Sequence, residues 1–417
     1  MDAILIRGGR PLRGHVEIGG SKNTVLPIMA ACLLAEGTHT IDNVPRLRDV
    51  ATMGKLIGIL GARTTGASGT LTVVTGAGDG HEAPYELVKT MRASIYVLGP
   101  ILARTGAARV SLPGGCAWGP RPVDLHIDGL QRMGAEITID HGYVDARARR
   151  LHGAAISFPQ PSVGATAHLM MAAALADGRT TITNAAMEPE IPSLAEFLTS
   201  MGARISGAGT PRVTIDGVER LSPGRIRVVP DRIEMGTYAV AGAITGGDIT
   251  LSGRASRCLG AVVDKLVEAG VEVSEEGETT RVHAPRPIQP VDVSTAPYPG
   301  FPTDMQAQIM ALMAIAGGRS VVTDTIYPDR FTHVAELRRL GAEIELRGNS
   351  AIVSRVDGLS GAPVMATDLR ASAALIIAGL VAKGETRVSR VYHIDRGYEG
   401  IEKKLGALGA DIERIRE

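Results

Sequence analysis

The chain carries the phrase Met133-Gly134-Ala135-Glu136-Ile137 where an amphipathic helix pattern gives way to an alternating strand pattern. A hydrophobic residue, a glycine and a small residue recur in this setting five more times, with 68 to 73 residues from each glycine to the next. Six units of about 70 residues therefore account for almost the whole chain. The other five phrases are Leu60-Gly61-Ala62, Met201-Gly202-Ala203, Ala269-Gly270-Val271, Leu340-Gly341-Ala342 and Leu408-Gly409-Ala410.

The glycine of each phrase follows the last apolar residue of a helix pattern. Helices commonly end in a left-handed residue at this position, so we expect a positive φ at all six glycines. A second pattern, a small-residue helix followed by a Gly turn and a strand, occurs in residues 172–183, 239–251 and 373–388. Each unit therefore has the pattern β–α–β–α–β.

These units are too long for an ordinary solenoid, whose repeats usually span about 20–50 residues. Two α/β domains of three units each explain the period better, because single cores seldom grow beyond roughly 250–300 residues. Helix segments rich in Ala and Gly, at 172–176, 239–243 and 311–318, are expected to be buried on every side.

Composition narrows the functional class. The 417 residues carry 44 basic and 44 acidic side chains, which gives no support for a nucleic-acid or acidic-membrane partner. Three cysteines argue against a disulfide framework and for a reducing compartment. The sequence has neither a signal core nor a stretch near the ~20 apolar residues of a membrane span, so we expect a cytoplasmic protein. The histidines lack metal-ligand spacing, and we predict no metal.

The stretch Leu112–His126 combines turn residues with reactive groups. Its glycines and prolines predict a loop around the lone thiol of Cys116, and Arg121, Asp124 and His126 follow within ten residues. Catalytic groups are often carried on such loops. An inert cysteine in a surface turn is the alternative interpretation.

Several helix patterns begin with residues suited to binding anions. Ser21 can cap the helix that starts near Lys22, and Arg92 and Arg370 occupy equivalent helix starts in two units. A cation at a helix N-terminus is unfavourable unless an anion is bound there, which indicates oxyanion sites. Ser162 opens the equivalent helix of the third unit. The alternative is that these cations are simply solvated.

Further charged residues lie on loops of the second half. Asp304, in Gly300-Phe-Pro-Thr-Asp304, precedes a helix and is either its N-cap or a general base. Arg330 and Arg396 add cations on other loops.

At these residues the chain resembles the UDP-N-acetylglucosamine 1-carboxyvinyltransferases, a group of enolpyruvyl transferases. The matching phrases run from end to end of the chain in the expected order. They are Gly20–Asn23, Met91–Ser94, Leu112–His126, Ser162–Thr166, Pro230–Glu234, Gly300–Gln308, Met365–Ser372 and Tyr392–Glu399.

The resemblance implies an α/β fold of two inside-out barrels, each made of three βαβαβ-type repeats with helices inside and sheets outside. Residues 22–229 would form one domain, which carries the Cys116 loop. Residues 1–21 and 230–417 would form the other, with the active site in the cleft between them.

The implied reaction transfers the enolpyruvyl group of phosphoenolpyruvate to the 3′-hydroxyl of UDP-N-acetylglucosamine and releases phosphate. It proceeds by addition and elimination through a tetrahedral intermediate, and it is the first committed step of peptidoglycan precursor synthesis. The two small molecules would be the only partners, no cofactor is expected, and the oligomeric state stays open.

The resemblance also assigns roles to residues. Cys116 would donate the proton to C3, could form a covalent adduct, and would make the enzyme sensitive to fosfomycin; Asp304 would be the base. Lys22, Arg121 and Arg396 would face phosphoenolpyruvate, with Arg330 and Arg370 near its carboxylate. The remaining substrate-binding residues would be Asn23, Arg92, Arg121, Pro122, Val123, Asp124, Leu125, Ser162, Val163, Gly164, Asp304 and Ile326. Closure of the loop over the sugar nucleotide would exclude water.

Three positions depart from the family pattern: Trp118 replaces a smaller aliphatic residue, Arg48 a frequent Lys, and Gln160-Pro161 lies where some members place a Lys. Three other functions stay open. They are enolpyruvyl transfer to another acceptor such as shikimate 3-phosphate, a non-catalytic UDP-sugar-binding paralogue, and an unrelated cysteine hydrolase using His126 as its base.

Overall fold

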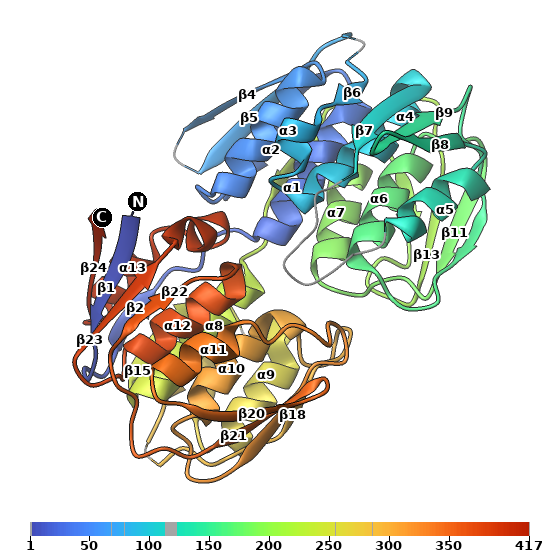
Figure 1. The fold of residues 1–417 in the computed structure, drawn as a ribbon. Helices are drawn as coiled ribbons and strands as arrows, with labels where there is room; N and C mark the ends of the chain where they lie inside the picture. Colours follow the sequence, from blue (N-terminus) through green and yellow to red (C-terminus); the bar gives the residue numbers. More distant parts are fainter. Residues whose placement is uncertain are drawn as a thin grey trace. The chain divides into compact units, whose positions relative to one another are not determined.

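The computed structural model describes residues 2–67, 69–78, 80–112, 123–254, 256–285 and 287–416. The chain divides into two compact units, coloured along the sequence in Figure 1. Gly20–Val229 form the middle unit, and Met1–Gly19 with Pro230–Glu417 form the terminal unit. Each unit has its own hydrophobic core.

The sheets of the described residues are six in number, all four-stranded and all with one strand arrangement. The first two strands of each are parallel, and the remaining neighbours are antiparallel. In the middle unit the first sheet has the strand order β14 (Arg225–Arg227), β3 (Gly37–Asp42), β5 (Thr70–Thr75), β4 (Ala62–Ala67). The second has the order β6 (Glu82–Ala83), β7 (Ala107–Ser111), β9 (Tyr143–Arg147), β8 (Glu136–Asp140). The third has the order β10 (Ala155–Ser157), β11 (Arg179–Thr183), β13 (Arg212–Asp216), β12 (Arg204–Ser206).

The terminal unit repeats this arrangement. Its orders are β2 (Arg13–Val16), β15 (Asp248–Ser252), β17 (Thr279–His283), β16 (Glu272–Glu276); β18 (Val293–Ser294), β19 (Ser320–Thr323), β21 (Ser350–Ser354), β20 (Glu343–Arg347); and β22 (Pro363–Met365), β23 (Glu385–Ser389), β1 (Asp2–Arg7), β24 (Asp411–Arg416).

The small-residue helices occupy the interior, as the sequence predicts. In the terminal unit these are α8 (Arg232–Thr245), α10 (Gln306–Met313) and α12 (Leu369–Gly379), and every residue of all three is buried. They pack against one another and lie side by side in Figure 1. Their counterparts in the middle unit are α1 (Lys22–Ala31), α4 (Leu98–Thr105) and α6 (Val163–Ala173). Helices inside and sheets outside define the inside-out α/β barrel.

The second helix of each repeat is amphipathic and ends at the repeated glycine. These helices are α2 (Arg48–Ile59), α5 (Asp124–Arg132), α7 (Glu190–Ser200), α9 (Ser256–Glu268), α11 (His333–Arg339) and α13 (Ile401–Ala407). The predicted positive φ is confirmed at all six glycines, with values from 87° at Gly270 to 106° at Gly202. One backbone rule therefore turns the chain from helix into strand six times over.

The sheets have a fourth strand that the βαβαβ pattern did not predict, because the strand after each glycine turns back as a hairpin. Two repeats also exchange their first strands. β2 joins the sheet of β15 in the terminal unit, while β14 joins the sheet of β3 in the middle unit. In the last repeat β1, from the start of the chain, pairs with both β23 and β24 and takes the place of that hairpin strand.

Two glycines, one within α2 and one just after it, test whether the positive φ at the end of the helix requires glycine. Gly61 has φ of 93°, and a Cβ there would make only ordinary contacts, so Gly61→Ala should cost about 1–2 kcal/mol of unfolding free energy through backbone strain alone. Gly58 is helical and faces open space, so Gly58→Ala should add about 0.5–1 kcal/mol. Urea unfolding of both variants measures this. Equal midpoints would contradict the rule.

Candidate active site

Asp304 lies between two arginines in the terminal unit. Its Oδ1 is 2.8 Å from Nη1 of Arg330, and its Oδ2 is 2.7 Å from Nη2 of Arg370. Nε of Arg370 also donates to Oδ2 at 3.1 Å. The side chains of Arg330 and Arg370 are only 7% and 4% exposed, against 28% for Asp304. The structure thus brings together three predicted site residues, with the carboxylate nearer to solvent than the guanidinium groups.

Arg370 is the second residue of α12, whose N-cap Asp368 accepts from the backbone N–H groups of Arg370 and Ala371. Burial is the largest single influence and lowers the pKa of Arg370, but the surrounding groups, first among them Asp304, together outweigh it, so the pKa is raised. Tyr398 and Asp231, the N-cap of α8, act in the same direction. Arg370 is therefore a permanent cation that needs an anion beside it.

Asp304 does not cap α10 through its side chain. It lies in the 3₁₀ turn Thr303–Met305 (η3) ahead of that helix, and the N-cap position of the turn is Pro302. The capping interpretation of Asp304 is therefore wrong for the described structure. Both carboxylate oxygens face arginines instead, which leaves an electrostatic or proton-transfer role.

A buried carboxylate that sequence reasoning missed organises the loop beside Arg330. Asp324 is fully buried and accepts hydrogen bonds from Thr295, Thr303 and the backbone N–H groups of Ile326 and Tyr327. Thr303 in turn accepts from Nη1 of Arg330 at 3.0 Å. Asp324 thereby fixes the backbone of Ile326, which is a predicted site residue. It also holds Thr303, the hydrogen-bond partner of Arg330, which is another predicted site residue.

Arg396 is the last residue of the 3₁₀ segment Val391–Arg396 (η4), which packs against α12. The side chain of Arg396 is half-buried. Its segment therefore contacts the helix that begins with Leu369 and Arg370.

In the middle unit, Lys22 is the first residue of α1 and Asn23 the second. Ser21 caps this helix by accepting from the N–H of Thr24, as predicted. Nζ of Lys22 lies 3.7 Å from Oδ2 of the buried Asp49, at the start of α2. Lys22 is thus a half-buried cation at a helix N-terminus with a carboxylate near it.

Arg92 begins a 3₁₀ segment, Arg92–Val97 (η2), that leads into α4 and contacts both α1 and α6. Ser162 caps α6 through the N–H of Ala165, and Val163 and Gly164 form its first turn. The segment that leads into α4 therefore packs against both other inner helices of this unit.

The described part of the predicted loop begins again at Val123, the N-cap of α5. Val123 is buried, Leu125 is half-buried and Asp124 is exposed. Cys116, Trp118, Arg121 and Pro122 lie outside the described residues.

A family model described as EPSP synthase (3-phosphoshikimate 1-carboxyvinyltransferase) matches residues 6–405. The chain belongs to this family of enolpyruvyl transferases. Proteins named UDP-N-acetylglucosamine 1-carboxyvinyltransferase from Geotalea uraniireducens and Acidiphilium cryptum are 56% and 57% identical to it, over 100% of each chain.

Solved structures agree with this family. The enolpyruvyl transferase NikO from Streptomyces tendae has a TM-score of 0.90 at 28% identity, covering 99% of this chain and 98% of its own. EPSP synthase from Acinetobacter baumannii has a TM-score of 0.77 at 18% identity over 100% of both chains, which shows the fold alone. The inside-out barrels are therefore the fold of enolpyruvyl transferases.

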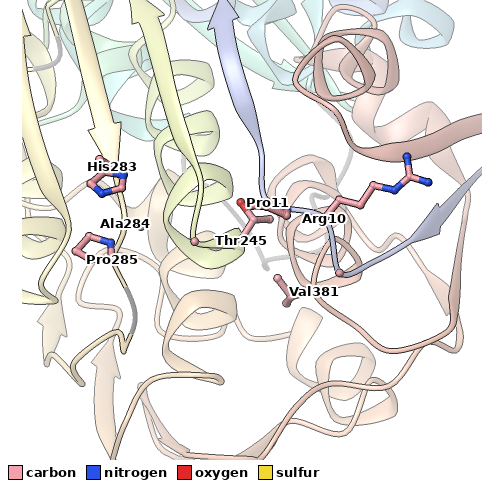
Figure 2. A pocket seen from close by; sticks show the side chains of 9 residues that line it. Arg10, Pro11, Thr245, His283, Ala284, Pro285 and Val381 are labelled. Atoms are coloured by element: carbon pink, nitrogen blue, oxygen red, sulfur yellow. The ribbon is translucent and has the colours of Figure 1, made fainter.

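Figure 2 shows a hollow of the terminal unit that lies elsewhere in this enolpyruvyl transferase. Thr245 and Gly246, at the C-terminal end of α8, line it with Arg10, His283 and Val381. A helix C-terminus carries partial negative charge, which disfavours an anion. Of the predicted substrate residues, Lys22, Val163 and Arg370 instead lie in the first turns of inner helices.

No described group of three or more His, Cys, Asp or Glu residues could hold a metal ion, and no described helix is long and apolar enough to cross a membrane.

His126, the base that a cysteine hydrolase would need, is a buried residue of α5. Its ring is buried in α5 and faces the first turn of α6, where a Cβ on Gly164 would lie 3.3 Å from its Nε2. Burial, with the charge of Arg92, lowers its pKa to about 3. Its ring centroid lies 4.9 Å from that of His168, whose Nε2 accepts from the N–H of Gly99. Such a weak base does not activate a thiol at neutral pH.

The buried neutral ring predicts a stability change with pH. The unfolded chain protonates His126 near its ordinary pKa, whereas the folded chain stays neutral down to about 3, so unfolding takes up a proton between these values. The unfolding free energy of the wild type should therefore fall as the pH is lowered from about 6 to 4, and His126 should contribute about 1.4 kcal/mol per pH unit to that slope. His126→Phe should remove this contribution and make the slope shallower by the same amount. Denaturant unfolding across this range measures it. The exposed His141→Asn should leave the slope unchanged, and equal slopes for all three proteins would refute the prediction.

Proposed function

We propose that this chain transfers the enolpyruvyl group of phosphoenolpyruvate to the 3′-hydroxyl of UDP-N-acetylglucosamine and releases phosphate. This is the first committed step of peptidoglycan precursor synthesis. The observation that carries the proposal is the identity of 54–57%, along the full chain, to seven relatives of that name. The chemistry of the described residues supports it.

Phosphoenolpyruvate has two anionic groups and therefore requires several cations. Arg330 and Arg370 direct their buried guanidinium groups at the two carboxylate oxygens of Asp304. The same geometry is suited to the carboxylate of the substrate. Lys22, Arg121 and Arg396 are assigned to the same substrate molecule. The proposal therefore draws on residues of both units.

Asp304 is paired with the two arginines, Arg330 and Arg370, that the substrate carboxylate would need to bind. We propose that the substrate carboxylate displaces it, so that the released Asp304 can accept the proton of the 3′-hydroxyl. The hydroxyl oxygen then forms a bond to C2 while Cys116 donates a proton to C3, which yields the tetrahedral intermediate. Loss of a C3 proton and cleavage of the C2–O bond to phosphate restore the enol double bond and release phosphate.

The sugar nucleotide is assigned to the starts of the middle unit's helices. Asn23, Arg92, Ser162, Val163 and Gly164 offer amide, guanidinium, hydroxyl and backbone groups there. The remaining contacts are assigned to residues 121–125, Asp304 and Ile326. We further propose that the protein works in the cytoplasm.

Enolpyruvyl transfer to shikimate 3-phosphate is the second candidate, since the family model takes its description from that reaction. Cys116 and the 121–125 run, together with the identity to the UDP-sugar enzymes, favour the first. A non-catalytic paralogue would be expected to have lost Cys116, Asp304 or the cations, and the sequence keeps all of them.

The decisive experiment is phosphate release from phosphoenolpyruvate with each acceptor. We expect release with UDP-N-acetylglucosamine and none with shikimate 3-phosphate. Cys116→Ser should lower the rate about 10²–10⁴-fold, because it removes the proton donor. The buried Cys32→Ser is the control for loss of a thiol as such. Turnover with shikimate 3-phosphate alone would overturn the acceptor assignment, and UDP-sugar binding without release would favour the paralogue.

If the substrate carboxylate displaces Asp304, removal of Asp304 should have opposite effects on two quantities: it should strengthen the binding of phosphoenolpyruvate and lower the rate of phosphate release. Asp304→Ala leaves two buried guanidinium groups without their carboxylate, so phosphoenolpyruvate alone should bind at least about tenfold more tightly than to the wild type. Phosphate release should nevertheless fall, since the base is lost. Calorimetry in low-chloride buffer measures the affinity, and the exposed Asp357→Ala is the control. Unchanged or weaker binding would show that Asp304 does not compete with the substrate.

A further inference from the structure

We propose that Tyr398 is a positioning residue that aligns Arg370 for the carboxylate of phosphoenolpyruvate. The inference rests on the proposed function and adds a residue to that site. Tyr398 is almost wholly buried in the terminal unit, and its phenol oxygen accepts a hydrogen bond from Nη1 of Arg370 at 3.1 Å.

The direction of the hydrogen bonds follows from the donors available. Thr237 of α8 donates its single hydroxyl proton to the carbonyl of Ile233 at 2.7 Å. Its oxygen lies 2.8 Å from the phenol oxygen of Tyr398, so Tyr398 must be the donor in that pair. Gln308 of α10 also donates to Thr237, at 3.1 Å. A single chain therefore runs from Arg370 through Tyr398 and Thr237 to the backbone of α8.

This chain fixes how the guanidinium group is turned. Nη1 of Arg370 is held by Tyr398, while Nε and Nη2 both donate to Asp304. A guanidinium group can pair with a carboxylate through its Nη1/Nη2 edge or its Nε/Nη2 edge. Because Tyr398 holds Nη1, the Nε/Nη2 edge is the one that faces Asp304. Gln308 also donates to the carbonyl oxygen of Asp304 at 3.0 Å, which ties the carboxylate's own backbone into the same network.

The environment keeps the phenol in the protonated form that the chain requires. Burial raises the pKa of Tyr398, against the lowering influence of Arg370 and Thr237. Tyr398 also lies two residues after Arg396, a cation assigned to phosphoenolpyruvate. One buried side chain thus anchors the segment of one substrate-facing arginine and orients another.

Tyr398→Phe tests the inference, since it removes one oxygen and leaves the ring. We expect KM for phosphoenolpyruvate to rise about five- to tenfold with KM for UDP-N-acetylglucosamine within about twofold of wild type. Calorimetry should show the same loss of affinity for phosphoenolpyruvate alone. Thr237→Val, which removes the acceptor of the phenol proton, should reproduce the effect, and the double variant should add little because the two groups act in series.

Tyr238→Phe is the matched control. Tyr238 is an equally buried tyrosine of α8 whose hydroxyl has no hydrogen-bond partner among the described residues, so its variant should leave both KM values within about twofold. A parallel rise of both KM values in Tyr398→Phe, or no change in either, would overturn the positioning role.

The calorimetry separates this inference from the proposed function. If wild type binds phosphoenolpyruvate and Tyr398→Phe binds it equally well, the inference alone fails. If wild type binds phosphoenolpyruvate but uses another acceptor, a selective loss in Tyr398→Phe still supports it. If wild type does not bind phosphoenolpyruvate, both fail together.

Discussion

A helix buried along its whole length can offer only its ends to a ligand, and this constraint governs the molecule. Every residue of α8, α10 and α12 is covered, so their sides serve the core alone. The chemistry must therefore collect where the helices begin. Each repeat of the terminal unit supplies one such start, with Asp231, Asp304 and Arg370 at or near the three of them. Three repeats thus converge on one charged cluster.

The cluster solves an electrostatic problem within the folded chain. Two guanidinium groups that are nearly inaccessible to water would be costly without a counter-charge, and the arginine of α12 also faces the positive end of its own helix. Asp304 lies against both as their shared counter-charge, and its one negative charge leaves the trio with a net positive charge. The arginines are consequently held in place by the folded chain itself, and under the proposed function a substrate carboxylate need only replace the carboxylate of Asp304. Preorganisation of this kind reduces the cost of ordering the site during the reaction.

The six repeats and the cations at the helix starts could be predicted from the sequence because both follow local rules, whereas the inside-out arrangement came from the family resemblance. A glycine after a helix, such as Gly134, needs only its own backbone to explain its positive φ. A helix of small residues indicates burial whatever surrounds it, and a cation at its start indicates an anion. Lys22 and Arg370 were identified by that reasoning. The named reaction and the residue roles came instead from the resemblance of whole phrases, which local rules do not provide.

The groups that hold those cations carry no comparable local signal. Arg370 meets Asp304 across 66 residues, and Thr237 meets Tyr398 across 161. From the sequence alone, Tyr398 has the pattern of an ordinary core residue and Asp324 that of a turn residue. Their partners become apparent only when the three repeats pack together in the folded unit. The same holds for β1, whose pairing with β24 joins the two ends of the chain. The orientation of Arg370 is therefore a property of barrel closure, since its neighbours come from different repeats.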